Sequence, residues 1–223
     1  MELKGLKINF IGDSITQGDV GPSSRSKSYH GLLKDEAGLA EARNYGMNGT
    51  KIARYQGNRG IEKNDVCDND DFCSRFHKMD DDADVVVVFG GTNDYGHGDA
   101  PLGEFTDRTP DTFYGACHFL FRGLIQKYLG KPIVIMTPLH RTNEMVKTGS
   151  LKPYPVATLK EYVDIIREVA EYYSLPVLDL YANSGLQPEI PEIKEKYIPD
   201  GTHPNDNGHR VVADKLRRFL EAL

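Results

Sequence analysis

One unbroken apolar run, residues 85–89 (Val-Val-Val-Val-Phe), constrains the fold of this chain more than any other segment. Its β-branched side chains are typical of a strand, and the lack of polar alternation indicates that both faces are buried. Strands buried on both faces occur in parallel sheets that carry helices on each side. After Gly90 the run passes into Gly91-Thr92-Asn93-Asp94, so polar groups follow the end of the strand. The run therefore predicts a strand of an α/β sheet.

The remaining strands and helices alternate along the chain. Shorter apolar runs predict strands at residues 8–11, 42–45, 133–136 and 177–180. Apolar side chains at helical spacing predict helices over residues 29–40, from Thr109 and Pro110 through Ile125, over 159–173, and at the C-terminus around Val211–Leu220. This order is typical of a parallel sheet with crossover helices. We therefore expect a single α/β domain over residues 1–223, with about five strands.

Two stretches carry little pattern. Residues 95–110 are rich in Gly, Pro and charge and are predicted to form a long surface loop. Within residues 51–82, Cys67, Cys73 and His77 lie among several aspartates and raise a metal hypothesis. Their spacing matches neither a standard zinc pattern nor a calcium loop. A solvated acidic loop is the better interpretation, and no metal is expected.

Composition restricts the partners and the location. Apolar residues make up 39% of the 223-residue chain, charged residues 27%, and the net charge is −6. A negative chain without a basic patch is a poor binder of nucleic acid or an anionic membrane. No apolar stretch reaches the roughly 20 residues that span a bilayer, and no signal-peptide pattern opens the chain. Three cysteines, an odd number, favour reduced thiols, so a cytoplasmic protein is expected.

Chemically competent side chains follow several of the predicted strands. Ser14 comes just after the first strand, while Asp200 and His203 lie three residues apart near the C-terminus. An aspartate that holds one imidazole nitrogen leaves the other free to take a serine proton. Gly49 and Asn93 add N–H donors suited to an oxyanion. The alternatives are structural: Asp200 would cap a turn with His203 on the surface. Gly49 would be a turn glycine and Asn93 a loop cap.

Four short blocks, in order, carry a resemblance to a known family. They are residues 12–14 (Gly-Asp-Ser), 44–49 (Asn-Tyr-Gly-Met-Asn-Gly), 91–94 (Gly-Thr-Asn-Asp) and 200–204 (Asp-Gly-Thr-His-Pro). The chain resembles the SGNH (GDSL-type) hydrolase family, with Ile15 where many members have leucine. The resemblance extends from residue 8 to the C-terminal helix. Residues 51–82 and 95–111 match no block, so no substrate contact can be transferred to them.

The resemblance implies a fold and a set of roles. The fold is a flavodoxin-like, three-layer α/β/α sandwich around a five-stranded parallel sheet. Ser14 would be the nucleophile, His203 the general base and Asp200 the acid that orients it. The N–H groups of Ser14 and Gly49 and the amide of Asn93 would form the oxyanion hole. The family requires neither a metal nor another cofactor.

The function expected from these features is serine-dependent hydrolysis of a small-molecule ester that carries a short-chain acyl or O-acetyl group. The alcohol part of that ester could be a carbohydrate. A lipid acylhydrolase or acyltransferase using the same site is an alternative, and so is a non-catalytic carbohydrate-binding protein. The chain lacks the Gly-x-Ser-x-Gly elbow and the nucleotide-binding fingerprints. Acyl length, alcohol and oligomeric state stay open, and a homo-oligomer is compatible with the sequence. Polar residues of the predicted loops slightly favour a hydroxylated substrate: Tyr95, His97, Asp99, Arg108, His140 and Arg141.

Overall fold

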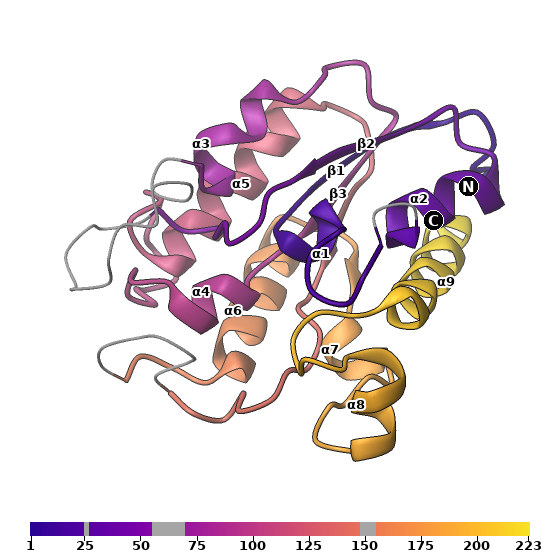
Figure 1. Ribbon diagram of the computed structural model, residues 1–223. Coiled ribbons are helices and arrows are strands. Elements are labelled where there is room, and N and C mark those ends of the chain that lie inside the picture. Colours follow the sequence, from indigo (N-terminus) through magenta and orange to yellow (C-terminus); the bar gives the residue numbers. More distant parts are fainter. Residues whose placement is uncertain (25–26, 55–69, 148–154) are drawn as a thin grey trace.

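A parallel sheet forms the centre of the molecule. The computed structural model describes residues 1–24, 27–54, 70–147 and 155–223. Within these residues five strands pair in parallel, in the order β2-β1-β3-β4-β5 (Figure 1). Their bounds are Lys7–Gly12 (β1), Glu41–Gly46 (β2), Val85–Phe89 (β3), Ile133–Met136 (β4) and Val177–Leu178 (β5). This is the flavodoxin-like strand order, so the predicted fold class is confirmed.

Helices cover both faces of the sheet. The helices α3 (Phe72–Arg75), α5 (Phe113–Lys127) and α6 (Leu159–Tyr172) pack on one face, and α2 (Tyr29–Ala37) and α9 (Asp206–Ala222) on the other (Figure 1). Successive valines of β3 point alternately into these two cores, which is why the run has no polar side. Shorter helical segments are α1 (Ser14–Gln17), η2 (Phe76–Lys78), α4 (Thr92–His97), α7 (Leu180–Asn183) and α8 (Pro191–Tyr197). In the described part of the chain, no helix combines the length and apolar character needed to cross a membrane.

The predicted surface loop at residues 95–110 is partly wrong. Its first residues belong to α4, and Tyr95 and Asp99 are buried. The following helix, α5, begins at Phe113 rather than at Pro110, because the hydroxyl of Thr112 accepts the N–H of Gly115 at 3.1 Å. The sequence contained two threonines able to cap this helix, and tertiary contacts selected the second.

Other elements also differ from the prediction in their bounds. The last strand stops at Leu178, because the next residue, Asp179, caps α7 by accepting the N–H of Ala182 at 3.1 Å. Helix α2 ends at Ala37, where Gly38 adopts a left-handed conformation. The segment before residue 199, predicted as a loop, contains α8, which begins with Pro191. A proline at the first helical position is a start signal that the sequence already offered.

Residues 51–54 and 70–82 of the acidic region are described by the structure. Cys73 is buried and its thiol contacts the carbonyl oxygens of Ile52 and Ala116. Asp71 is also buried and caps α3 by accepting the N–H of Ser74 at 2.8 Å, so this part is not a solvated loop. Cys67 and Asp68 lie outside the described residues.

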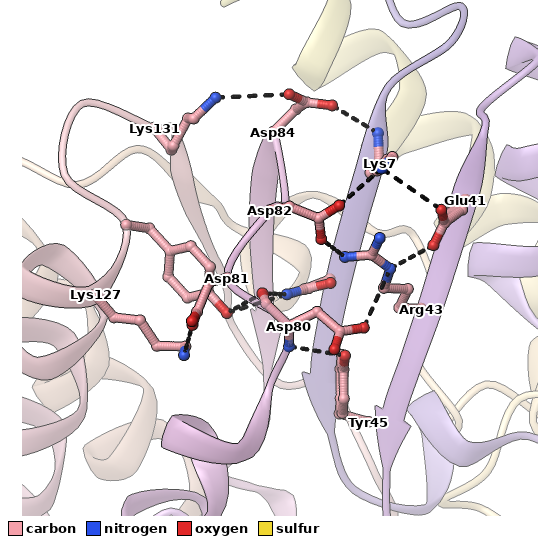
Figure 2. A network of polar contacts seen from close by, with 12 residues as sticks. Lys7, Glu41, Arg43, Tyr45, Asp80, Asp81, Asp82, Asp84, Lys127 and Lys131 are labelled. Atoms are coloured by element: carbon pink, nitrogen blue, oxygen red, sulfur yellow. Dashed lines mark hydrogen bonds and ion pairs between the residues drawn. The ribbon is translucent and has the colours of Figure 1, made fainter.

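Charged side chains tie the amino ends of β1 and β2 to the turn before β3 (Figure 2). The guanidinium of Arg43 lies among the carboxylates of Glu41, Asp80 and Asp82, at 2.5, 3.4 and 2.5 Å respectively. Lys7 also contacts Asp82, at 2.7 Å. These hydrogen bonds from Arg43 and Lys7 hold the pKa of Asp82 well below its usual range. The network joins the strands at the amino edge of the sheet. The Gly-Asp-Ser and Gly-Thr-Asn-Asp blocks follow β1 and β3 at the opposite, carboxyl edge.

Candidate active site

Ser14 lies where β1 turns into α1, at the carboxyl edge of the sheet. The strand ends at Gly12, and Asp13 caps α1 by accepting the N–H of Ile15 at 3.0 Å. Ser14 is therefore the first residue of the helix, with its N–H at a position that has no intrahelical partner. Burial raises the pKa of the Asp13 carboxyl to about 6, against the opposing effect of the Ile15 hydrogen bond.

His203 and Asp200 extend from Ser14 as a hydrogen-bonded chain. Ser14 Oγ is 3.0 Å from His203 Nε2, and His203 Nδ1 is 2.8 Å from Asp200 Oδ2. The other carboxylate oxygen, Oδ1, accepts the backbone N–H groups of Thr202 and His203 at 2.8 and 2.7 Å. The predicted pairing of Asp200 with His203 across three residues is thus present, and its turn geometry holds both groups.

This geometry determines where the protons lie. A carboxylate only accepts hydrogen bonds, so His203 donates from Nδ1, and Nε2 of the neutral ring accepts the Ser14 hydroxyl proton. Partial burial by itself raises the pKa of Asp200. The hydrogen bonds from the His203 side chain, the His203 N–H and the Thr202 N–H outweigh that effect and lower the pKa to about 2. Asp200 is therefore ionised at neutral pH.

The loop after β2 presents candidate oxyanion donors. Gly49 has a φ of +74°, a conformation that glycine adopts without strain. Asn93 Nδ2 donates to the carbonyl of the next residue, Thr50, at 3.0 Å, which joins α4 to this loop. Among the described residues, the structure gives no acceptor to the N–H of Ser14 or Gly49 and only Thr50 O to Asn93 Nδ2. Three donors with an unused hydrogen thus lie on α1, on α4 and on the loop after β2, which is hydrogen-bonded to both helices.

Comparison with known proteins agrees with the sequence blocks. The model of the GDSL-like Lipase/Acylhydrolase family matches residues 10–211. The chain belongs to this family. It is accordingly an ester hydrolase, as the sequence predicted. A search of the curated proteins found no match.

Solved structures share this fold over nearly the whole chain. A protein from Lactobacillus plantarum is 30% identical with a TM-score of 0.82, and the alignment covers 98% of each chain. A possible lipase from Chitinophaga pinensis is 22% identical with a TM-score of 0.68, covering 97% of this chain and 98% of that one. An acetyl xylan esterase is 22% identical with a TM-score of 0.62, covering 98% and 100%. These last two likenesses concern the fold.

Two buried residues of the hydrolase support the loop after β2, and sequence reasoning assigned neither of them a role. Asp94 accepts the N–H groups of Ile52 and Ala53, both at 2.9 Å. Arg75 Nη2 donates to Gly12 O at 2.6 Å and to Thr50 Oγ1 at 3.1 Å. Burial lowers the pKa of Arg75 to about 10, so its charge persists at neutral pH. Asp94 stood in a matched block, whereas no local pattern marks Arg75.

The polar residues predicted to face a hydroxylated substrate divide into two groups. Tyr95, Asp99 and Arg141 are buried. The Tyr95 hydroxyl donates to the carbonyl of Asn143 at 2.5 Å, and Arg141 Nη1 donates to the carbonyl of Thr92 at 3.1 Å. These contacts of Tyr95 and Arg141 stabilise α4 and the loop after β4. His97, Arg108 and His140 retain exposed surface.

Proposed function

We propose that this hydrolase cleaves short-chain carboxylic esters, O-acetyl esters of carbohydrate among them, through an acyl-enzyme on Ser14. The observation that carries the proposal is the hydrogen-bonded chain from Ser14 through His203 to Asp200. A serine beside an oriented imidazole is the arrangement that activates a hydroxyl for attack on a carbonyl. A protein of the same fold is an acetyl xylan esterase, so O-acetyl esters are the first substrates to test.

In the first half of the reaction, Ser14 Oγ attacks the ester carbonyl carbon while His203 Nε2 takes the hydroxyl proton. The carbonyl oxygen becomes an oxyanion, which the N–H groups of Ser14 and Gly49 and the amide of Asn93 would stabilise. Asp200 holds the Nδ1–H and stabilises the imidazolium that forms. His203 then passes its proton to the leaving alcohol oxygen, which gives the free alcohol and the acyl-enzyme.

In the second half, His203 removes a proton from water, and the hydroxide oxygen attacks the acyl carbon. The second oxyanion collapses with release of the carboxylic acid, and the proton returns from His203 to Ser14 Oγ. An alcohol in place of water would give acyl transfer by the same steps. The proportion of the two outcomes is measured by adding a competing alcohol to the assay.

The proposal is tested with an ester panel that varies acyl length and alcohol, run on wild type and Ser14→Ala. We expect turnover of acetyl esters by the wild type, and loss of most activity in Ser14→Ala with an unchanged melting temperature. A serine-directed phosphonate should label the wild type once, on Ser14. Wild-type turnover by Ser14→Ala, or an adduct mapped to another serine, would contradict the assignment. A preference for long acyl chains would favour the lipid acylhydrolase alternative.

A further inference from the structure

The side chain of Asn93 is held at both ends. Its Nδ2 donates to Thr50 O at 3.0 Å, and its Oδ1 is 3.1 Å from His97 Nε2. His97 lies one helical turn further along α4, on the same face as Asn93. Asn93 is buried and the imidazole is half-buried. The contact therefore lies beneath the surface, beside the loop that carries Gly49.

Hydrogen-bond chemistry fixes the direction of both contacts. Thr50 O can only accept, so the atom that faces it must be the Asn93 nitrogen, and the amide oxygen faces His97. His97 must then donate from Nε2, in the neutral and the charged ring alike. One Nδ2 hydrogen is used by Thr50 O, and the other is left for a ligand.

We propose that His97 is a positioning residue for ester hydrolysis, because it holds the Asn93 amide with its nitrogen toward the reacting oxyanion. The inference rests on the proposed function, in which Asn93 stabilises that oxyanion. Without the His97 donor, Oδ1 loses its partner, and the amide is held at one end only, by the bond from Nδ2 to Thr50 O. Donation to Oδ1 also polarises the amide and strengthens the hydrogen bond that Nδ2 donates.

The support on the other side of the amide makes this role specific. Thr50 is itself fixed, since its hydroxyl donates to Met47 O at 2.8 Å and accepts from Arg75 Nη2 at 3.1 Å. Thr50 O therefore stays in place when His97 is removed, and the loss falls on the orientation of Asn93. Removal of His97 is expected to change the transition state more than the binding of substrate.

The test is a double-mutant cycle with His97→Ala, Asn93→Ala and the double variant, assayed on an acetyl ester. Asn93→Ala should lower kcat about 10²- to 10³-fold, as loss of one oxyanion donor does. His97→Ala should lower kcat roughly 10-fold with little change in KM, since the interaction is realised in the transition state. The double variant should be no slower than Asn93→Ala, because His97 acts through Asn93. His97→Gln, whose amide can donate to Oδ1, should recover most of the activity.

Each outcome decides a separate point. A normal kcat in Asn93→Ala would remove the oxyanion role of Asn93 and the inference with it. A strong loss in Asn93→Ala beside a normal kcat in His97→Ala would overturn the inference and leave the proposed function intact. Multiplying losses in the double variant would also overturn it, because they would show that His97 acts independently. Melting temperatures are measured for each variant, and a loss of kcat in His97→Ala that His97→Gln does not restore counts against the proposal.

Discussion

Substitution of Gly21 by alanine should reduce catalysis by pressing on the pair formed by Asp200 and His203. Gly21 lies in the loop after α1, with a φ of +62°. A Cβ built there would lie 3.0 Å from Asp200 Oδ2 and 3.1 Å from His203 Cβ. Contacts that short require the neighbouring atoms to move by a few tenths of an ångström. The far end of the loop is anchored, since Ser24 N–H donates to Asp206 Oδ1 at 2.8 Å.

The magnitude follows from two separable effects. A left-handed alanine costs about 1–2 kcal/mol of folding free energy whatever surrounds it. Gly130 has a φ of +74° with nothing within 4 Å of its Cβ position, so Gly130→Ala measures that strain alone. The additional contact at Gly21 displaces Asp200 and His203 by less than the ~1 Å that costs about 100-fold in rate. We therefore expect roughly a 10-fold loss of kcat in Gly21→Ala, equivalent to about 1.4 kcal/mol of barrier.

The assay combines urea unfolding with steady-state hydrolysis of an acetyl ester. Both variants should lose similar unfolding free energy, and only Gly21→Ala should lose kcat. Equal kcat in Gly21→Ala and wild type would refute the reasoning, because it would show that the loop moves while Asp200 and His203 stay in place. Equal losses of kcat in Gly21→Ala and Gly130→Ala would refute it as well, since backbone strain would then account for both.

Two further predictions concern stability. The folded-state pKa of Asp13, raised to about 6, lies above the value of about 4 expected in the unfolded chain. The folded protein therefore takes up a proton first as the pH falls, and ionised Asp13 destabilises the fold above about pH 6 by up to roughly 3 kcal/mol. Asp13→Asn should be more stable than wild type at about pH 8, and this difference in unfolding free energy should shrink toward about pH 4. Urea unfolding at both pH values measures the difference, and the same difference at both would contradict the prediction. Arg43→Gln should lower the melting temperature because it leaves three carboxylates facing one another. This decrease in melting temperature should be smaller in about 1 M salt than in about 0.01 M salt, because salt screens the repulsion. A decrease that does not depend on salt would instead indicate packing by the aliphatic part of the arginine.

Elements with a strong local signal were predictable from the sequence. Residues 85–89 form β3 with the predicted bounds, because a run of β-branched residues favours an extended strand wherever it is buried. The Asp200–His203 pairing was predictable too, since a short turn brings side chains three residues apart together without help from the rest of the fold. The blocks around Ser14, Gly49 and Asn93 pointed to one edge of the sheet because parallel strands end there together.

Tertiary contacts alone decided the remaining features. Helix α5 begins at Phe113 because its N–H donates to Pro101 O at 2.9 Å, a partner twelve residues away that no local pattern specifies. Helix α4 is too short to form from propensity and depends on contacts such as Arg141 to Thr92 O. Arg75 reaches the ends of β1 and β2 from a separate part of the chain. Such residues have no sequence signature, because their role depends on groups that only the folded chain brings within hydrogen-bonding distance.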